Sequence, residues 1–157
     1  MGTGKSAVSQ ALSQISGWPA LDSDALIVER ERMSIPDIFA KHGEHYFRQC
    51  ESEILEQILS GKKQIVATGG GAVLAEKNRR LMLRHGFVVS LSAEPEKIVE
   101  RVSNNEERPL LAGDARKKVY EMLDKRKGAY DFADLKIDTT CLAVEEIAAK
   151  IWEAKDL

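Results

Sequence analysis

The chain of 157 residues is 43% hydrophobic and carries a formal net charge of −2, values that fit one globular domain and give no indication of nucleic-acid binding. No apolar run approaches the roughly 20 residues that cross a bilayer, and the chain does not begin with a signal-peptide pattern. The two cysteines and three histidines lack the spacing of a disulfide framework or a zinc site, so we expect a soluble cytoplasmic protein with no membrane partner.

The N-terminal segment predicts a helix followed by a short strand. A helix is expected over residues 5–15, because apolar residues recur at i, i+4 and i+7 and Gly17 follows where a C-cap belongs. A strand is expected over residues 19–22. Either Ser23 or Asp24 is expected to cap the next helix, which runs to about residue 32.

The next segment predicts two successive helices and a buried strand. Ser34 precedes Asp37 by three residues, which is the spacing of a capping box, and Gly43 is expected to end this first short helix. A longer helix is expected over residues 44–59. The β-branched and apolar residues 64–68 then predict a strand that leads directly into three consecutive glycines.

The C-terminal half continues the same alternation of helices and strands. Helices alternating with short apolar strands are typical of a parallel sheet with helices on both faces, so the fold class is α/β. The elements expected here are a helix over 76–85, a strand over 87–91, a helix over 95–102, a mobile loop over 104–114, a helix over 116–127, a strand over 135–138 and a helix over 144–154.

The first six residues, MGTGKS, match the end of a phosphate-binding loop, GxxxxGK followed by Ser or Thr. In such a loop backbone N–H groups surround phosphate, Lys5 reaches the β- and γ-phosphates, and Ser6 binds magnesium. The match is short, but it precedes an amphipathic helix whose N-terminus favours an anion. The first glycine of the loop and the strand before it are missing ahead of Met1.

Polar residues and glycines follow the predicted strands, where ligands bind in parallel sheets. Asp22 and Asp24 follow one strand, and Gly69 to Gly71 follow the next. Each has a simpler interpretation: the aspartates are helix caps, and the glycines form a turn. Arg48 is likewise consistent with an ordinary helix-surface pair to Glu44 and Glu51.

Eight segments in order make a more specific pattern: GTGKS, LDSD, SIPDIF, GEHYFRQCE, ATGGGAV, RPLLAG, KRKGAY and IDTT. This series resembles the shikimate kinases, and the resemblance covers essentially the whole chain. It implies a three-layer α/β/α P-loop kinase fold with a parallel sheet, as a single domain over 1–157 with a lid loop at about 104–116. It also implies ATP-dependent phosphorylation of the 3-hydroxyl of shikimate in aromatic amino-acid biosynthesis.

The resemblance also implies the site residues, with Mg²⁺ as cofactor and ATP and shikimate as small-molecule substrates. Lys5, Asp24 and Arg108 would be catalytic, Asp24 by accepting the proton of the substrate hydroxyl. Arg101 would stack on adenine, and Ser6 and Asp22 would hold the metal ion. The implied ATP-binding residues are Gly2, Thr3, Gly4, Lys5, Ser6, Ala7, Arg101 and Arg108. The implied shikimate-binding residues are Asp24, Arg48, Gly69, Gly70, Gly71 and Arg126.

Two departures from the family pattern bear on these expectations. Val144 stands where members often carry a proline near adenine, and the central N-terminal strand is missing. We therefore hypothesise that the sequence is N-terminally truncated relative to a working kinase. Alternatives are another small-molecule kinase, such as a gluconate-type enzyme, and a kinase-like remnant that binds ligand without turnover. We expect a monomer, because no apolar stripe is left after the core faces are assigned.

Overall fold

The computed structural model describes residues 3–104 and 112–156. Contacts between residues group the chain into two compact units. One unit is Ser9–Phe87, and the other joins Met1–Val8 to Val88–Leu157. Helix α1 (Lys5–Ser16) begins in the second unit and continues into the first.

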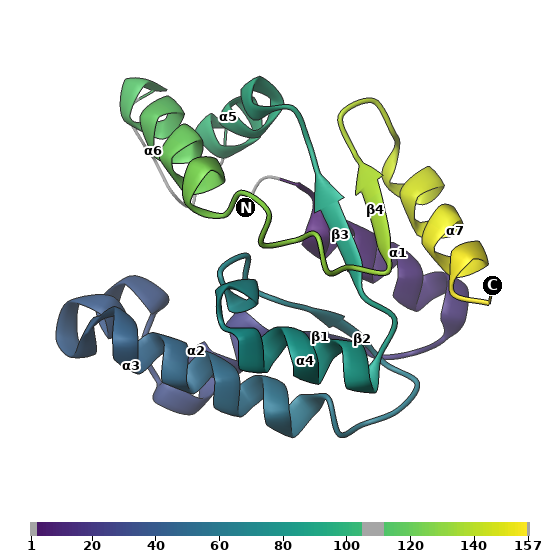
Figure 1. Cartoon of the computed structure of the whole chain (residues 1–157), viewed down its shortest axis with the longest axis horizontal. Helices are drawn as coiled ribbons and strands as arrows, with labels where there is room; N and C mark the ends of the chain where they lie inside the picture. Colours follow the sequence, from purple (N-terminus) through teal and green to yellow (C-terminus); the bar gives the residue numbers. More distant parts are fainter. Residues whose placement is uncertain (1–2, 105–111, 157) are drawn as a thin grey trace. The chain divides into compact units, whose positions relative to one another are not determined.

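The unit Ser9–Phe87 contains one pair of parallel strands and the helices that follow them. Leu21 of β1 is paired with Val66 of β2. Helix α2 packs against α3 (Figure 1). The elements are β1 (Ala20–Asp22), α2 (Ser23–Glu31), α3 (Ile35–Ile58), β2 (Ile65–Ala67), the 3₁₀ helix η1 (Ala72–Leu74) and α4 (Glu76–His85).

The other unit contains a second pair of parallel strands. Val89 of β3 is paired with Leu135 of β4, and the pairing continues to Ser92 and Asp138. Helix α5 packs against α6, and α7 contacts β4. After the start of α1, the elements are β3 (Val89–Ser92), α5 (Pro95–Ser103), α6 (Ala112–Lys125), β4 (Leu135–Asp138) and α7 (Val144–Ala154).

The alternation of helices with parallel strands confirms the predicted order of elements, with some local differences. Asp22, and not Ser23 or Asp24, caps α2, because its carboxylate accepts the N–H groups of Asp24 and Ala25. The two helices predicted on either side of Gly43 form one element, α3, with a kink at this glycine (φ 85°, ψ 172°). The short 3₁₀ helix η1 was not predicted.

Helix α6 begins earlier than the sequence predicts. It starts at Ala112, whereas the helix was expected from residue 116 after a loop over 104–114. The end of the expected lid loop is therefore helical, and its central residues, 105–111, lie outside the described residues. None of the helices in the described ranges is both long and apolar enough to cross a bilayer.

Each unit has its own cluster of buried apolar side chains. In the unit Ser9–Phe87 this cluster joins α2 to α3 and consists of Ile27, Ile38, Phe47, Cys50 and Ile54. In the other unit Ile98 and Val102 of α5 pack against Val119 of α6. The apolar face of α3 therefore holds this helix in a fixed rotation against α2.

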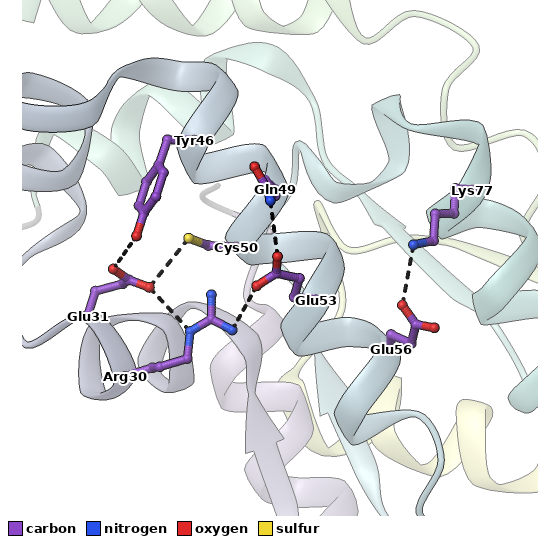
Figure 2. A network of polar contacts seen from close by, with 8 residues as sticks. All are labelled: Arg30, Glu31, Tyr46, Gln49, Cys50, Glu53, Glu56 and Lys77. Atoms are coloured by element: carbon purple, nitrogen blue, oxygen red, sulfur yellow. Dashed lines mark hydrogen bonds and ion pairs between the residues drawn. The ribbon is translucent and has the colours of Figure 1, made fainter.

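Polar contacts centred on Glu31 add to the packing of α2 against α3 (Figure 2). The hydroxyl of Tyr46 donates to Glu31 Oε2 at 2.8 Å, and Arg30 Nε and Cys50 Sγ approach Glu31 Oε1 at 3.2 and 3.5 Å. The hydrogen bond from Tyr46 lowers the pKa of Glu31, and the same bond raises the pKa of Tyr46 to about 12. Glu31 is thus stabilised as a carboxylate against the α3 helix.

We predict that Tyr46→Phe destabilises the protein in a pH-dependent way. The hydrogen bond from Tyr46 holds the folded-state pKa of Glu31 below its ordinary value of 4.5, so this contribution is complete above that pH and is lost as the pH falls through the lower, folded-state pKa. Urea unfolding at neutral pH is expected to show a lower midpoint for the variant. The difference from the unmodified protein is expected to shrink below pH 4.5.

Tyr120→Phe is the matched control for this experiment. Tyr120 also donates to a carboxylate, Glu96 Oε1 at 2.7 Å, but both side chains are exposed. Its removal is expected to change the urea midpoint little at any pH, because exposed polar pairs contribute little. Equal effects of the two substitutions would contradict the role assigned to Tyr46.

Candidate functional site

The glycine-rich turn begins directly after β2, where the chain leaves the sheet. The N–H of Gly69 donates to Ser23 Oγ at 3.2 Å, and Ser23 is fully buried at the start of α2. Since β1 and β2 are parallel, this bond joins the segments that follow their carboxyl ends. The structure thus brings the glycines beside the LDSD segment, as the order of the strands predicted.

Gly69 is in close contact with two carboxylate side chains. A Cβ at this position would lie 2.7 Å from Asp24 Oδ1 and 3.0 Å from Glu51 Oε2. Real Cβ atoms essentially never approach another atom to 2.7 Å, so the absence of a side chain at Gly69 is what admits Asp24, and a Cβ there would also crowd Glu51. Asp24 from α2 and Glu51 from α3 therefore meet at this point of the turn.

Gly71 has the same relation to the guanidinium of Arg48. A Cβ here would lie 2.5 Å from both Nη1 and Nη2 of Arg48. The guanidinium also lies 5.3 Å from the centre of the Phe47 ring, within the range of a cation–π contact. The glycine turn thus has carboxylates against its first residue and a cation against its third.

Arg48 forms ion pairs with two glutamates of its own helix. Its Nη1 lies 2.8 Å from Glu51 Oε1, and its Nε lies 3.7 Å from Glu44 Oε1. Glu44 is 68% exposed and fits the predicted surface pair, but the side chain of Glu51 is only 1% exposed. The surface interpretation is therefore wrong for Glu51, which is a buried carboxylate that holds Arg48.

The position of Glu51 in the helix was a signal that the sequence analysis missed. Glu51 lies four residues after Phe47 and three before Ile54, so it belongs to the apolar face of α3. A glutamate on a buried face requires a partner, because an unpaired carboxylate is costly to desolvate. Arg48, whose side chain is 29% exposed, supplies this partner and still reaches the surface.

Side chains of α4 hold the segment that follows the glycines. Asn78 Nδ2 donates to the carbonyl of Ala72 at 3.0 Å, and Arg79 Nη1 donates to the carbonyl of Val73 at 2.6 Å. Asn78 is buried. These bonds fix η1 and so limit the movement of the turn, a role that the sequence did not indicate because neither residue belongs to a recognised motif.

Asp22 is a helix cap, which is the simpler of the two interpretations that the sequence allows for it. Its Oδ1 accepts the N–H of Asp24 at 2.9 Å and that of Ala25 at 3.2 Å. This cap fixes the first turn of α2, which carries Asp24. A structural role for Asp22 is thus established, and one of its oxygen atoms is occupied by it.

The phosphate-loop residues lie in the other unit. Gly4 has φ 88°, a left-handed conformation that favours glycine, and its carbonyl accepts the N–H of Val8 at 3.0 Å as α1 begins. Lys5 is therefore the first residue of the helix, and Ser6 is exposed in its first turn. Gly2 lies outside the described residues.

Three arginines of this unit were predicted as site residues, and two of them, Arg101 and Arg126, lie in the described part of the chain. Arg101, on α5, donates to Thr139 Oγ1 at 3.3 Å and to the Thr139 carbonyl at 3.4 Å. Arg126 is half-buried in the turn that follows α6. Arg108 lies outside the described residues.

A family model described as shikimate kinase matches residues 1–155. The chain belongs to the shikimate kinase family. The shikimate kinase of Geobacter metallireducens is 42% identical over 152 residues, which are 96% of this chain and 85% of the relative. The shikimate kinase of Moorella thermoacetica is 36% identical over 154 residues, covering 98% of this chain and 89% of the relative.

Solved structures of the shikimate kinase family agree with this assignment. Shikimate kinase from Acinetobacter baumannii in complex with shikimate has a TM-score of 0.90 and 35% identity, covering 98% of this chain and 87% of that chain. Shikimate kinase from Aquifex aeolicus has a TM-score of 0.82 and 31% identity, covering 99% and 91%. The predicted α/β P-loop kinase fold is therefore confirmed.

We predict that Glu51→Gln destabilises the protein much more than Glu44→Gln does. Glu51→Gln leaves a neutral amide in the buried position that now holds a carboxylate, with an expected loss of about 1–3 kcal/mol. Glu44→Gln removes the exposed partner of the same arginine and is expected to cost less than about 1 kcal/mol. Urea denaturation of both variants measures the difference, and equal losses would contradict the buried role of Glu51.

Proposed function

We propose that the protein transfers the γ-phosphoryl group of ATP to the 3-hydroxyl of shikimate. Family membership supports this reaction. The single observation that carries the proposal for this chain is the glycine turn, against which the carboxylate of Asp24 and the guanidinium of Arg48 both pack. A carboxylate beside a cation suits an acceptor that carries both a hydroxyl and an acid group.

The acid group of the acceptor would bind Arg48. A guanidinium presents its N–H groups in a planar fork that matches a carboxylate, whereas a lysine would offer only a point charge. Glu51 holds one edge of this fork at 2.8 Å and so fixes its orientation before the ligand arrives. We assign Arg126 as a second cation for the same carboxylate, and the backbone of Gly69, Gly70 and Gly71 to the ring hydroxyls.

Asp24 would act on the reacting hydroxyl of shikimate. The hydroxyl oxygen forms a bond to the γ-phosphorus, the bond from this phosphorus to the β–γ bridging oxygen breaks, and ADP leaves. The proton of the hydroxyl passes to the Asp24 carboxylate. The contacts of Asp24 with the glycine turn and with the capped first turn of α2 support this role, since both limit its movement.

The phosphates of ATP would bind at the start of α1. This N-terminus presents N–H groups and the positive end of the helix dipole, both suited to an anion. Lys5 would contact the transferred group, and Arg101 would contact adenine. The proposal also assigns Gly2, Thr3, Gly4, Ser6 and Ala7 to the phosphates, and Arg108 to the γ-phosphate.

We assign the divalent metal of this family as Mg²⁺. Magnesium prefers oxygen ligands and keeps several waters, so it needs few protein groups. The Ser6 hydroxyl and the Asp22 carboxylate are such ligands, and the use of one Asp22 oxygen as a helix cap leaves the second for a water-mediated contact. When bound, the ion neutralises phosphate charge.

The proposal also covers the oligomeric state of the protein and its location in the cell. We propose a monomer in the cytoplasm. The cysteines support a reducing compartment, because both are free thiols, Cys50 buried and Cys141 exposed.

A coupled assay of ADP release tests the proposed reaction. The whole 157-residue chain is incubated with ATP, Mg²⁺ and either shikimate, gluconate or a nucleoside. Turnover with shikimate alone supports the proposal. Turnover with gluconate would indicate another small-molecule kinase, and ligand binding without turnover would indicate a kinase-like remnant.

We predict that Asp24→Asn lowers kcat by roughly 10²–10⁴, the usual contribution of a positioned acid or base. The amide keeps the shape of the side chain but cannot accept the proton, so folding and substrate affinity are expected to change little. Asp37→Asn is the matched control, because it removes one negative charge from the exposed first turn of α3. Unchanged turnover in Asp24→Asn would refute the assigned role.

We predict that Arg48→Ala lowers stability, because it removes the cation that pairs with the buried Glu51, and that in the folded protein it raises KM for shikimate and leaves the affinity for ATP unchanged. The charged contact to the ligand carboxylate is lost, which corresponds to roughly a 10- to 100-fold change. Arg80→Ala serves as a control, since it removes an arginine whose exposed side chain pairs only with the exposed Glu76 among the ion pairs of the described residues. An equal loss of affinity for both substrates in Arg48→Ala would count against a carboxylate contact.

A further inference from the structure

The IDTT segment ends strand β4 and begins the turn that follows it, and the proposed function assigns it no role. Thr139 is the first residue after β4 and is only 1% exposed. A buried hydroxyl normally requires hydrogen-bond partners. The partners of Thr139 lie in three separate segments of the unit, one of which is the phosphate loop.

The hydroxyl of Thr139 contacts the phosphate loop, the end of β3 and the helix α5. Its Oγ1 lies 3.3 Å from the carbonyl oxygen of Thr3, 3.0 Å from that of Ser92 and 3.3 Å from Nη1 of Arg101. The backbone of Thr139 forms two more hydrogen bonds. Its N–H donates to the Ser92 carbonyl at 2.7 Å, and its carbonyl accepts from Arg101 Nη2 at 3.4 Å.

The chemistry of a hydroxyl suits this set of neighbours. It has one hydrogen to donate and two lone pairs that accept, whereas a guanidinium only donates and a carbonyl only accepts. Thr139 therefore donates to a carbonyl and accepts from Arg101 at the same time. Ser92 keeps the backbone N–H of Thr139 as a partner when the hydroxyl hydrogen turns toward Thr3.

We propose that Thr139 is a positioning residue for the nucleotide, whose hydroxyl aligns the phosphate loop with Arg101. The inference rests on the proposed function, which assigns the loop to the phosphates and Arg101 to the base. The hydroxyl of Thr139 then sets the distance between the phosphate loop and Arg101, the groups assigned to the two ends of the nucleotide. Loss of the Thr139 hydroxyl is expected to weaken the binding of ATP and ADP, and to leave the residues assigned to shikimate unaffected.

Thr140 provides a matched control in the same turn. Its N–H and its hydroxyl donate to Asp138 Oδ1 at 2.9 and 2.5 Å, and its hydroxyl accepts the N–H of Glu94 at 2.9 Å. The hydrogen bonds from Thr140 also lower the pKa of Asp138. Thr140 thus fastens the turn to the start of α5, and its removal perturbs the turn through partners other than Thr3 and Arg101.

The test compares Thr139→Ser with Thr139→Ala, two smaller side chains that differ by one hydroxyl. ADP binding is measured by calorimetry on the full-length protein, and KM is measured for ATP and for shikimate. We expect Ser to retain the affinity for ADP and Ala to weaken it about tenfold relative to Ser, the scale of one to two hydrogen bonds. KM for ATP is expected to rise in parallel, and KM for shikimate to stay within about twofold.

Thr139→Val, which keeps the shape but not the hydroxyl, is expected to behave like Thr139→Ala, and Thr140→Val like the unmodified protein. Equal ADP affinities for the Ser and Ala variants would overturn the proposal, and so would an equal loss in Thr140→Val. A parallel rise of both KM values in the Ala variant would show a general structural role and overturn it too. Because ADP binding does not require phosphoryl transfer, these outcomes are distinguishable from a failure of the shikimate reaction.

Discussion

The ion pair between Arg48 and the buried carboxylate of Glu51 is the interaction on which the proposed acceptor site depends. Glu51 lies on the apolar face of α3, so burying its charge costs free energy, which the ion pair with Arg48 offsets. The guanidinium in turn occupies the space that a side chain at Gly71 would fill. The FRQCE segment supplies Arg48 and Glu51, and the GGG segment supplies Gly71, which leaves room for Arg48. The two segments therefore depend on each other for this contact.

Local signals in the sequence were sufficient to predict most of the fold. The apolar periodicity of residues 5–15 and the residues Ser34 and Pro95 at helix starts gave the correct elements. Helix boundaries were less predictable where several adjacent residues can act as the N-cap, as Asp22, Ser23 and Asp24 can at the start of α2. The 3₁₀ helix η1 could not be predicted, because it depends on bonds from Asn78 and Arg79 of a later helix.

The candidate site was predictable only where residues follow neighbouring strands. The order of β1 and β2 was enough to bring Asp24 and the glycines together, since parallel strands end at the same edge of a sheet. The contact of Thr139 with Thr3 was not predictable, because the two residues are 136 positions apart and their contact depends on tertiary packing. Whether Glu51 was an exposed or a buried partner of Arg48 likewise depended on which face of α3 is buried.

The carboxylates around Arg48 also have a consequence for charge balance. Glu51 at 2.8 Å and Glu44 at 3.7 Å together carry two formal negative charges beside the single positive charge of Arg48. An acid that binds here must therefore share a cation that is already neutralised, and the attraction between free ligand and site is weaker than one arginine suggests. Selectivity for an anion then comes from the fixed direction of the N–H groups rather than from excess positive potential.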